Sequence, residues 1–130
     1  MSSSDEVVSA PPPVSRSNTE VEQQMGEAHR HYIMGRFDQA KEILEKVITK
    51  EPKSPDPYHL LGIISEDSKE PERAVSFFYL AAKTTHNDPE LWTKVAYMYK
   101  DLEHYKQACY CFSRAVKNKG GLDVDLMKEQ

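Results

Sequence analysis

The sequence predicts an all-α protein in which three helix-turn-helix repeats stack as an α-solenoid behind a disordered N-terminal tail. The first observation is a step of 34 positions that joins small residues to small residues along the chain. The second is that bulky apolar residues recur at the same step, as stacked helix pairs need for tight crossings and a shared core. Three such columns are Ala40, Ala74 and Ala108; Leu44, Phe78 and Phe112; and Val47, Ala81 and Ala115.

The period divides the chain of 130 residues into predicted repeats at 21–54, 55–88 and 89–122. Three helix pairs are about the minimum that buries a continuous core, because each pair leaves an apolar face open until a neighbour covers it. Leu126 lies 34 positions after Trp92. Residues 123–130 are therefore expected to begin a further repeat or to form a capping helix.

Residues 1–20 are expected to be a disordered tail, since they hold runs of serine and proline and little apolar material to offset the entropy of ordering. The segment is acidic and interrupted by prolines, which argues against a secretory signal, and its single arginine argues against a transit peptide. No stretch of the chain reaches the apolar length of a membrane-spanning helix. An intracellular protein without membrane contact is expected.

In the first repeat, helices are predicted at about 21–34 and 38–49. Gly35 follows the first of them and is expected to end it, because glycine tolerates the left-handed conformation of a helix C-terminus.

The second and third repeats carry helix-start signals. Either Ser54 or Asp56 is expected to be the N-cap of the second repeat, because a proline follows each at the first helical position. Pro71 is compatible with the first turn of the partner helix. Asp88 is expected to cap the third repeat, and the final helix is predicted at about 104–117.

The net charge of −4 gives no reason to expect direct nucleic-acid binding. The charge is uneven: the second repeat has six acidic and three basic residues, the third has three acidic and six basic, and the first is neutral. This polarity either orients a partner or is the ordinary imbalance of solvated helix faces. Cys109 and Cys111 are two apart on a helix and diverge, so they are expected to be reduced, buried or half-buried thiols.

No catalytic, cofactor-binding or metal-binding constellation is found. The sequence has no glycine-rich phosphate loop, no serine elbow and no histidine pair at metal-ligand spacing. Glu66 and Asp67 are adjacent, so on a helix they diverge by about 100° and do not form an acid/base pair. The chain is therefore predicted to be no enzyme, with no cofactor, metal or small-molecule substrate.

Solenoids of this type bind partners on the concave surface formed by the first helix of each pair. Ile63 and Tyr97 stand at one position of adjacent repeats and would form an apolar ladder for an extended or helical peptide. The alternative is that they pack locally or cover a missing neighbour. The full predicted groove is Met25, His29, Tyr32, His59, Ile63, Glu66, Thr93, Tyr97 and Lys100.

One set of small and aromatic residues recurs at fixed places in the repeats: Tyr58, Leu61, Gly62, Ala74, Phe78 and Ala81, with Trp92, Ala96, Tyr99, Ala108, Phe112 and Ala115. In these residues the repeats resemble the tetratricopeptide family. The resemblance implies a right-handed superhelix that binds proteins and catalyses nothing. Some members clamp chaperone tails with basic and amide side chains, whose positions here are Met25, His29, Leu60, Glu90 and Lys94. Only Lys94 matches, so chaperone-tail binding is disfavoured.

Three short stretches are more discriminating within that family: Met25-Gly26-Glu27-Ala28, Glu66-Asp67 and Ala81-Ala82. In them the chain resembles the first repeats of the tetratricopeptide subunits of transcription factor TFIIIC, as a fragment or short paralogue. The resemblance implies a nuclear scaffold for RNA polymerase III genes, whose partners are other TFIIIC subunits and the TFIIB-related component of TFIIIB. The alternative is a cytoplasmic adaptor or co-chaperone that binds peptide tails.

Overall fold

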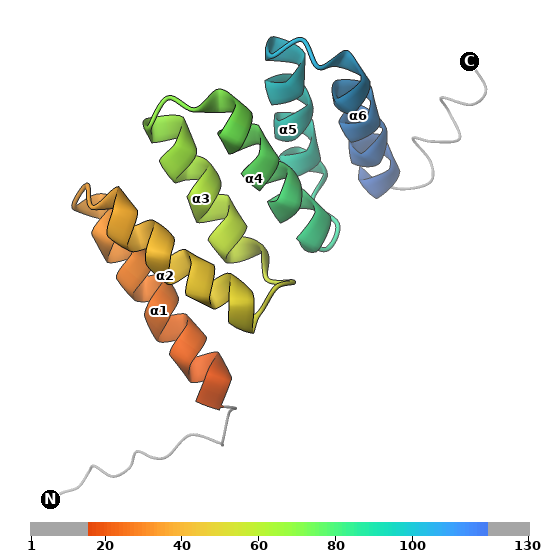
Figure 1. The fold of residues 1–130 in the computed structure, drawn as a ribbon. Coiled ribbons are helices and arrows are strands. Elements are labelled where there is room, and N and C mark those ends of the chain that lie inside the picture. Colours follow the sequence, from red (N-terminus) through yellow and green to blue (C-terminus); the bar gives the residue numbers. More distant parts are fainter. Residues whose placement is uncertain (1–15, 120–130) are drawn as a thin grey trace, which may run out of the picture. The chain divides into compact units, whose positions relative to one another are not determined.

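The computed structural model describes residues 16–119, and within this range it contains six α-helices and no strand (Figure 1). The predicted all-α class is confirmed. Most of the predicted tail, and all of 123–130, lie outside the described residues. The helices are α1 (Arg16–Ile33), α2 (Phe37–Lys50), α3 (Pro55–Asp67), α4 (Pro71–Thr84), α5 (Pro89–Asp101) and α6 (Tyr105–Lys119).

The chain divides into two compact units, Met1–Lys50 and Glu51–Gln130. In the first unit α1 packs against α2. Gly35 has a φ of 78°, and this left-handed residue ends the helical hydrogen bonding as its position predicts. The repeat boundaries themselves remain a prediction.

The first helix begins earlier than predicted, at Arg16 and not near residue 21. Nζ of Lys50 at the end of α2 lies 3.0 Å from Oε1 of Glu20, one residue before the predicted start. This contact supports the helix at Glu20, and the composition of residues 16–19 gave no signal of the further turn.

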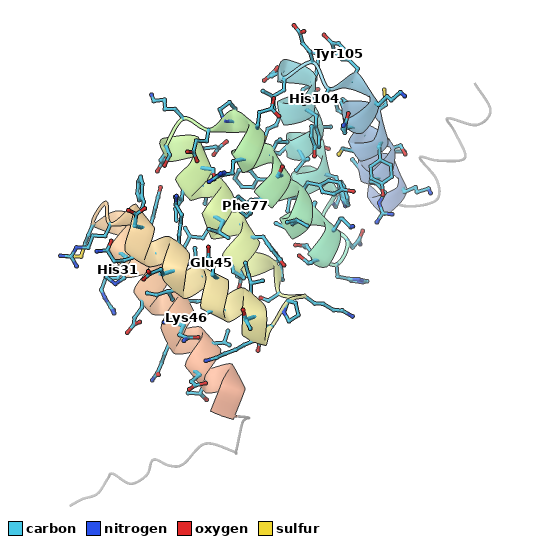
Figure 2. All side chains as sticks on the ribbon, in the orientation of Figure 1. His31, Glu45, Lys46, Phe77, His104 and Tyr105 are labelled. Carbon is cyan, nitrogen blue, oxygen red and sulfur yellow. The ribbon has the colours of Figure 1, made fainter. Side chains whose placement is uncertain are left out.

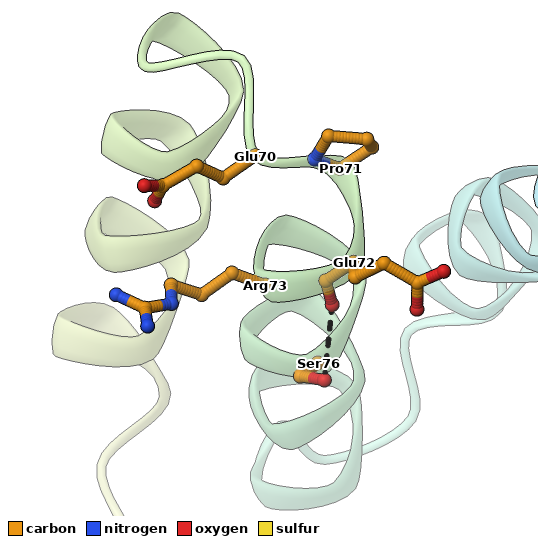
Figure 3. A pocket seen from close by; sticks show the side chains of 5 residues that line it. All are labelled: Glu70, Pro71, Glu72, Arg73 and Ser76. Atoms are coloured by element: carbon orange, nitrogen blue, oxygen red, sulfur yellow. Dashed lines mark hydrogen bonds between the residues drawn. The ribbon is translucent and has the colours of Figure 1, made fainter.

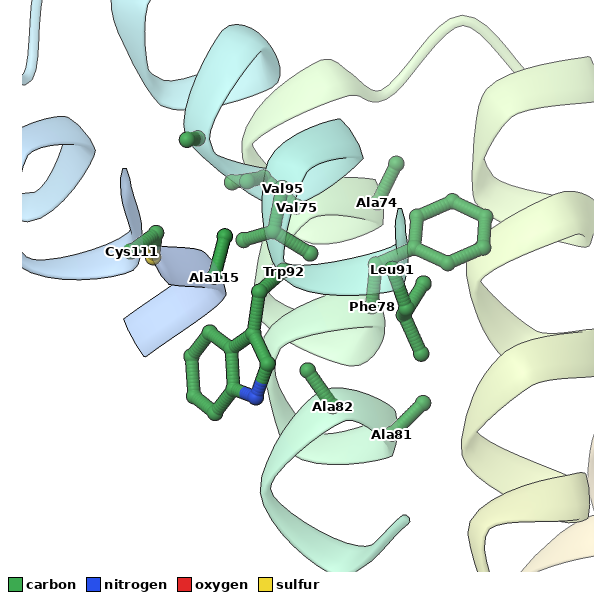
Figure 4. Close-up of a cluster of buried hydrophobic side chains, with 11 residues drawn as sticks. Ala74, Val75, Phe78, Ala81, Ala82, Leu91, Trp92, Val95, Cys111 and Ala115 are labelled. Carbon is green, nitrogen blue, oxygen red and sulfur yellow. The ribbon is translucent and has the colours of Figure 1, made fainter. Parts of the chain in front are cut away.

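In the second unit α3 pairs with α4, α5 pairs with α6, and α4 packs against α5. The core between them is a cluster of apolar side chains around the indole of Trp92, whose side chain is 1% exposed (Figure 4). Cys111 belongs to this core, whereas Cys109 is exposed, so the prediction that both thiols are buried or half-buried is wrong for Cys109. Residues two apart on a helix point in directions that differ by about 200°, so only one of these two cysteines can face the core.

The helix starts of the second unit resolve the open choice of caps. Ser54 is the N-cap of α3, although its side chain makes no capping hydrogen bond. Pro71 is the first residue of α4. Asp88 caps α5 as predicted, since its Oδ1 accepts a hydrogen bond from the backbone N–H of Leu91 at 3.1 Å. Among the described residues, no helix is long and apolar enough to cross a bilayer.

Candidate protein-binding surface

Three of the predicted groove residues lie on α1, in the first unit. Met25 is half-buried and His29 is exposed. Tyr32 is half-buried, and its ring stacks on that of Phe37, with the ring centroids 5.7 Å apart. Tyr32 is therefore tied to the turn between α1 and α2 and is less free to meet a partner than His29.

The other six predicted residues lie in the second unit, on the first helices of its two pairs. Ile63 and Thr93 are half-buried, so they offer part of their surface only. The Thr93 hydroxyl donates to the carbonyl oxygen of Pro89 at 2.9 Å and is satisfied within its own helix. The exposed members are His59 and Glu66 on α3, with Tyr97 and Lys100 on α5.

The ring of Phe78 joins α3, α4 and α5 beneath this surface. His59 meets the ring edge-on, with centroids 5.2 Å apart, and Nζ of Lys94 lies over it, 4.1 Å from the centroid. Burial lowers the pKa of His59, and the nearby Lys94 ammonium lowers it further. At neutral pH the cationic group here is therefore Lys94, beside an uncharged imidazole.

Tyr97 is the exposed aromatic residue of the surface. It is 53% exposed, and its ring stands perpendicular to that of Phe112 on α6, with centroids 5.1 Å apart. Such edge-to-face contacts hold a ring in place. Tyr97 therefore presents apolar area at a low cost in side-chain entropy, which is the property of a residue that anchors a partner.

Two hollows lie at the ends of α3 and α5; each includes one predicted groove residue, Glu66 or His59, and the rest of both linings was not predicted. One, of about 480 Å³, has an apolar floor that includes Met98 and Leu102. Met98 shares the 34-residue column of the buried Ile64, so the sequence contained a signal that this side of α5 is apolar. The larger hollow is lined by Glu66, Lys69, Glu70, Pro71, Met98, Asp101 and Leu102; the other, of about 350 Å³, by Pro55, Asp56, His59, Ala81, Thr85, Asp88 and Leu91.

A further hollow, of about 530 Å³, lies at the start of α4 and has no convergent chemistry (Figure 3). Glu70 and Arg73 point toward α3, whereas Glu72 points the opposite way. The Ser76 hydroxyl donates to the backbone oxygen of Glu72 at 3.1 Å, and so it is engaged within the helix. Over residues 16–119, no three histidine, cysteine or acidic side chains come together as a metal site.

The family model for the tetratricopeptide repeat matches residues 31–96. The chain is 30% identical over 93 residues to human general transcription factor 3C polypeptide 3, and 31% identical over 97 residues to the Saccharomyces cerevisiae transcription factor tau 131 kDa subunit. These matches cover 72% and 75% of this chain. The chain spans about a tenth (10%) of the length of each relative.

Solved structures share the fold at low sequence identity. The N-terminal domain of stress-induced protein-1 from C. elegans is 14% identical with a TM-score of 0.68, and the match covers 89% of this chain and 98% of that one. The second TPR of Spaghetti, bound to an HSP90 peptide, is 10% identical with a TM-score of 0.61. That match covers 78% of this chain and 96% of the Spaghetti chain. At these identities the likeness concerns the fold alone.

Proposed function

The chain belongs to the tetratricopeptide repeat family, and from this membership we propose that it is a non-enzymatic scaffold that binds protein partners. The surface on α3 and α5 is the proposed binding site. It comprises the exposed ring of Tyr97, the half-buried Ile63 and the Lys94 ammonium. Such a surface suits an extended or helical peptide that carries an apolar anchor.

The finer proposal is a role in transcription by RNA polymerase III, in the nucleus, within an assembly of the TFIIIC type. The observation that carries it is the identity of about 30% with a human and a yeast transcription factor over about three quarters of the chain. The partners proposed are other TFIIIC subunits and the TFIIB-related component of TFIIIB. The chain itself contacts neither DNA nor a membrane in this proposal.

A cytoplasmic adaptor that binds peptide tails is the second candidate. Its support is the likeness in fold to a tetratricopeptide domain bound to an HSP90 peptide. Lys94 occupies one clamp position of such domains, whereas Leu60 is buried and Glu90 carries the wrong charge for a carboxylate ligand. These departures favour the transcription scaffold.

Affinity purification of the tagged full chain from its source cell tests the proposal. Recovery of TFIIIC subunits supports it, and recovery of chaperones without them contradicts it. The Tyr97→Ala variant is expected to lose the partners while keeping its helical circular dichroism. Tyr105→Ala is the matched control, because Tyr105 is 60% exposed in the same unit but lies at the start of α6 (Figure 2).

A further inference from the structure

A fourth hollow, away from the predicted groove, is lined chiefly by tyrosines. It has a volume of about 330 Å³ and receives Tyr79 from α4, Tyr99 from α5, and Lys106, Gln107 and Tyr110 from α6. None of these residues belongs to the groove on α3 and α5. Tyr99 is two positions from Tyr97, so the two rings leave α5 in different directions.

The tyrosine rings are held by contacts with one another and with the core. Tyr79 lies edge-to-face against Tyr99 and Trp92, with centroids 6.3 Å and 5.8 Å apart. Tyr110 makes the same type of contact with Trp92 at 6.1 Å. Because the indole of Trp92 is fully buried, it anchors both rings. The phenol groups are thus preorganised at the pocket.

The Tyr79 and Tyr99 phenols remain hydrogen-bond donors well above neutral pH. Burial raises the pKa of Tyr79 and of Tyr99 above the ordinary value for tyrosine. The Tyr110 phenol and the Cys111 thiol nearby raise the pKa of Tyr79 further, and the Arg114 guanidinium lowers it in part. An uncharged phenol can donate a hydrogen bond to an acceptor in the pocket.

The fixed charges around the pocket are mainly positive. Lys106 lines it, Nζ of Lys83 lies 5.6 Å from the Tyr79 centroid, and the Arg114 guanidinium lies 5.1 Å from the Trp92 centroid. Among residues 16–119, none of the carboxylates lines the pocket. Glu72, which lies near Tyr99, already interacts with Nε2 of His104, 3.1 Å from its Oε1. The pocket therefore combines hydrogen-bond donors with positive charge and is complementary to an anion.

We propose that this pocket binds an aspartate or glutamate side chain in an acidic segment of a protein partner. The carboxylate accepts hydrogen bonds from the tyrosine hydroxyls and pairs with Lys106, and the aliphatic part of the segment packs on the ring edges. Stacking of nucleic-acid bases is disfavoured, because Lys83 covers a face of Tyr79 and Arg114 covers a face of Trp92. The proposal is independent of what binds on α3 and α5.

The test uses the full chain and two short fluorescent peptides, one rich in aspartate and glutamate and one with asparagine and glutamine in their place. Anisotropy is expected to show binding of the acidic peptide and at least about tenfold weaker binding of the amide peptide, since hydrogen bonds to a charged group are the stronger kind. Lys106→Gln and Tyr110→Phe are each expected to weaken acidic-peptide binding about tenfold, and Tyr110→Phe keeps the ring against Trp92.

Matched controls separate this pocket from the groove and from general charge. Lys100→Gln makes the same charge change on the predicted groove, and Tyr105→Phe removes an exposed phenol outside the pocket. Both are expected to bind the acidic peptide as the parent chain does. Three results would overturn the proposal: no binding of the acidic peptide at millimolar concentration, equal loss in the controls, or tighter binding of an oligouridine than of the acidic peptide. Retained helical circular dichroism shows that each variant is folded.

Discussion

Gly62 lies directly against the ring of Phe78: a Cβ at residue 62 would meet Cε2 and Cζ of the ring at 2.9 Å. Phe78 cannot move away easily, because it is fully buried and is covered by His59 and Lys94. The close crossing of α3 and α4 therefore depends on the absence of a side chain at this position.

Gly62→Ala is expected to lower the free energy of unfolding by about 1–3 kcal/mol, because one methyl group overpacks a filled core. Gly26→Ala is the matched control, since a Cβ at that helical position meets nothing within 4 Å. It is expected to stabilise the chain by about 0.5–1 kcal/mol through helix propensity. Urea unfolding measures the change in free energy for each variant. Equal effects of the two substitutions would contradict the close crossing of α3 and α4 at Gly62.

The N-caps of α3 and α5 allow a second comparison. Asp88→Ala removes an observed side-chain hydrogen bond to the N–H of Leu91 and is expected to cost about 1 kcal/mol. Ser54→Ala removes no capping hydrogen bond, so its expected cost is under about 0.5 kcal/mol. Urea unfolding of the two variants checks the difference. A larger loss for Ser54→Ala would show that its hydroxyl caps α3 in solution.

The two thiols are expected to differ in reactivity. Burial raises the pKa of Cys111 to about 11, whereas Cys109 is exposed. A thiol reagent at mildly alkaline pH should therefore label Cys109 quickly and label Cys111 only after unfolding. The Cys109→Ser and Cys111→Ser variants assign the two rates, and fast labelling of Cys109→Ser would contradict the burial of Cys111.

The raised pKa of the Cys111 thiol predicts how alkaline pH affects the free energy of unfolding. The Cys111 pKa is higher in the folded protein than the ordinary value of 9.0, so the folded state keeps a proton that the unfolded chain releases. The contribution of this thiol to the free energy of unfolding is therefore complete below pH 9.0 and is lost as the pH rises toward about 11. Cys111→Ala should remove this part of the pH dependence in urea unfolding.

His59 gives a pH dependence of the opposite sign. Its pKa is lowered below 6.5 by burial and by Lys94, so the unfolded chain binds a proton more readily. The contribution of His59 to the free energy of unfolding is therefore present above pH 6.5 and is lost as the pH falls through the lowered pKa. Lys94→Gln is expected to raise the pKa of His59 in an NMR titration of the imidazole. Lys100→Gln is the control and should leave this pKa unchanged.

Local patterns were sufficient to predict most of the fold. The 34-residue step places Ala74, Phe78 and Trp92 in core columns, and all three are buried. Helix starts at Pro71 and Asp88 follow from residue chemistry within a few positions. The start of α1 was predicted too late; at Glu20 the helix is supported by a contact with Lys50, 30 positions away, which local composition does not reveal. The predicted groove residues remain a proposal for the site, and the hollow floored by Met98 was missed.

The sequence by itself determined the all-α class, the repeat period and the columns that fill the core, because helical periodicity and capping act over a few residues. Only the tertiary structure decided that Cys109 is exposed, why residue 62 must lack a side chain, and that three tyrosines from three helices surround one pocket. These features depend on the angle and distance at which α3, α4, α5 and α6 pack. Such packing is set by many side chains together, and no single stretch of the chain encodes it.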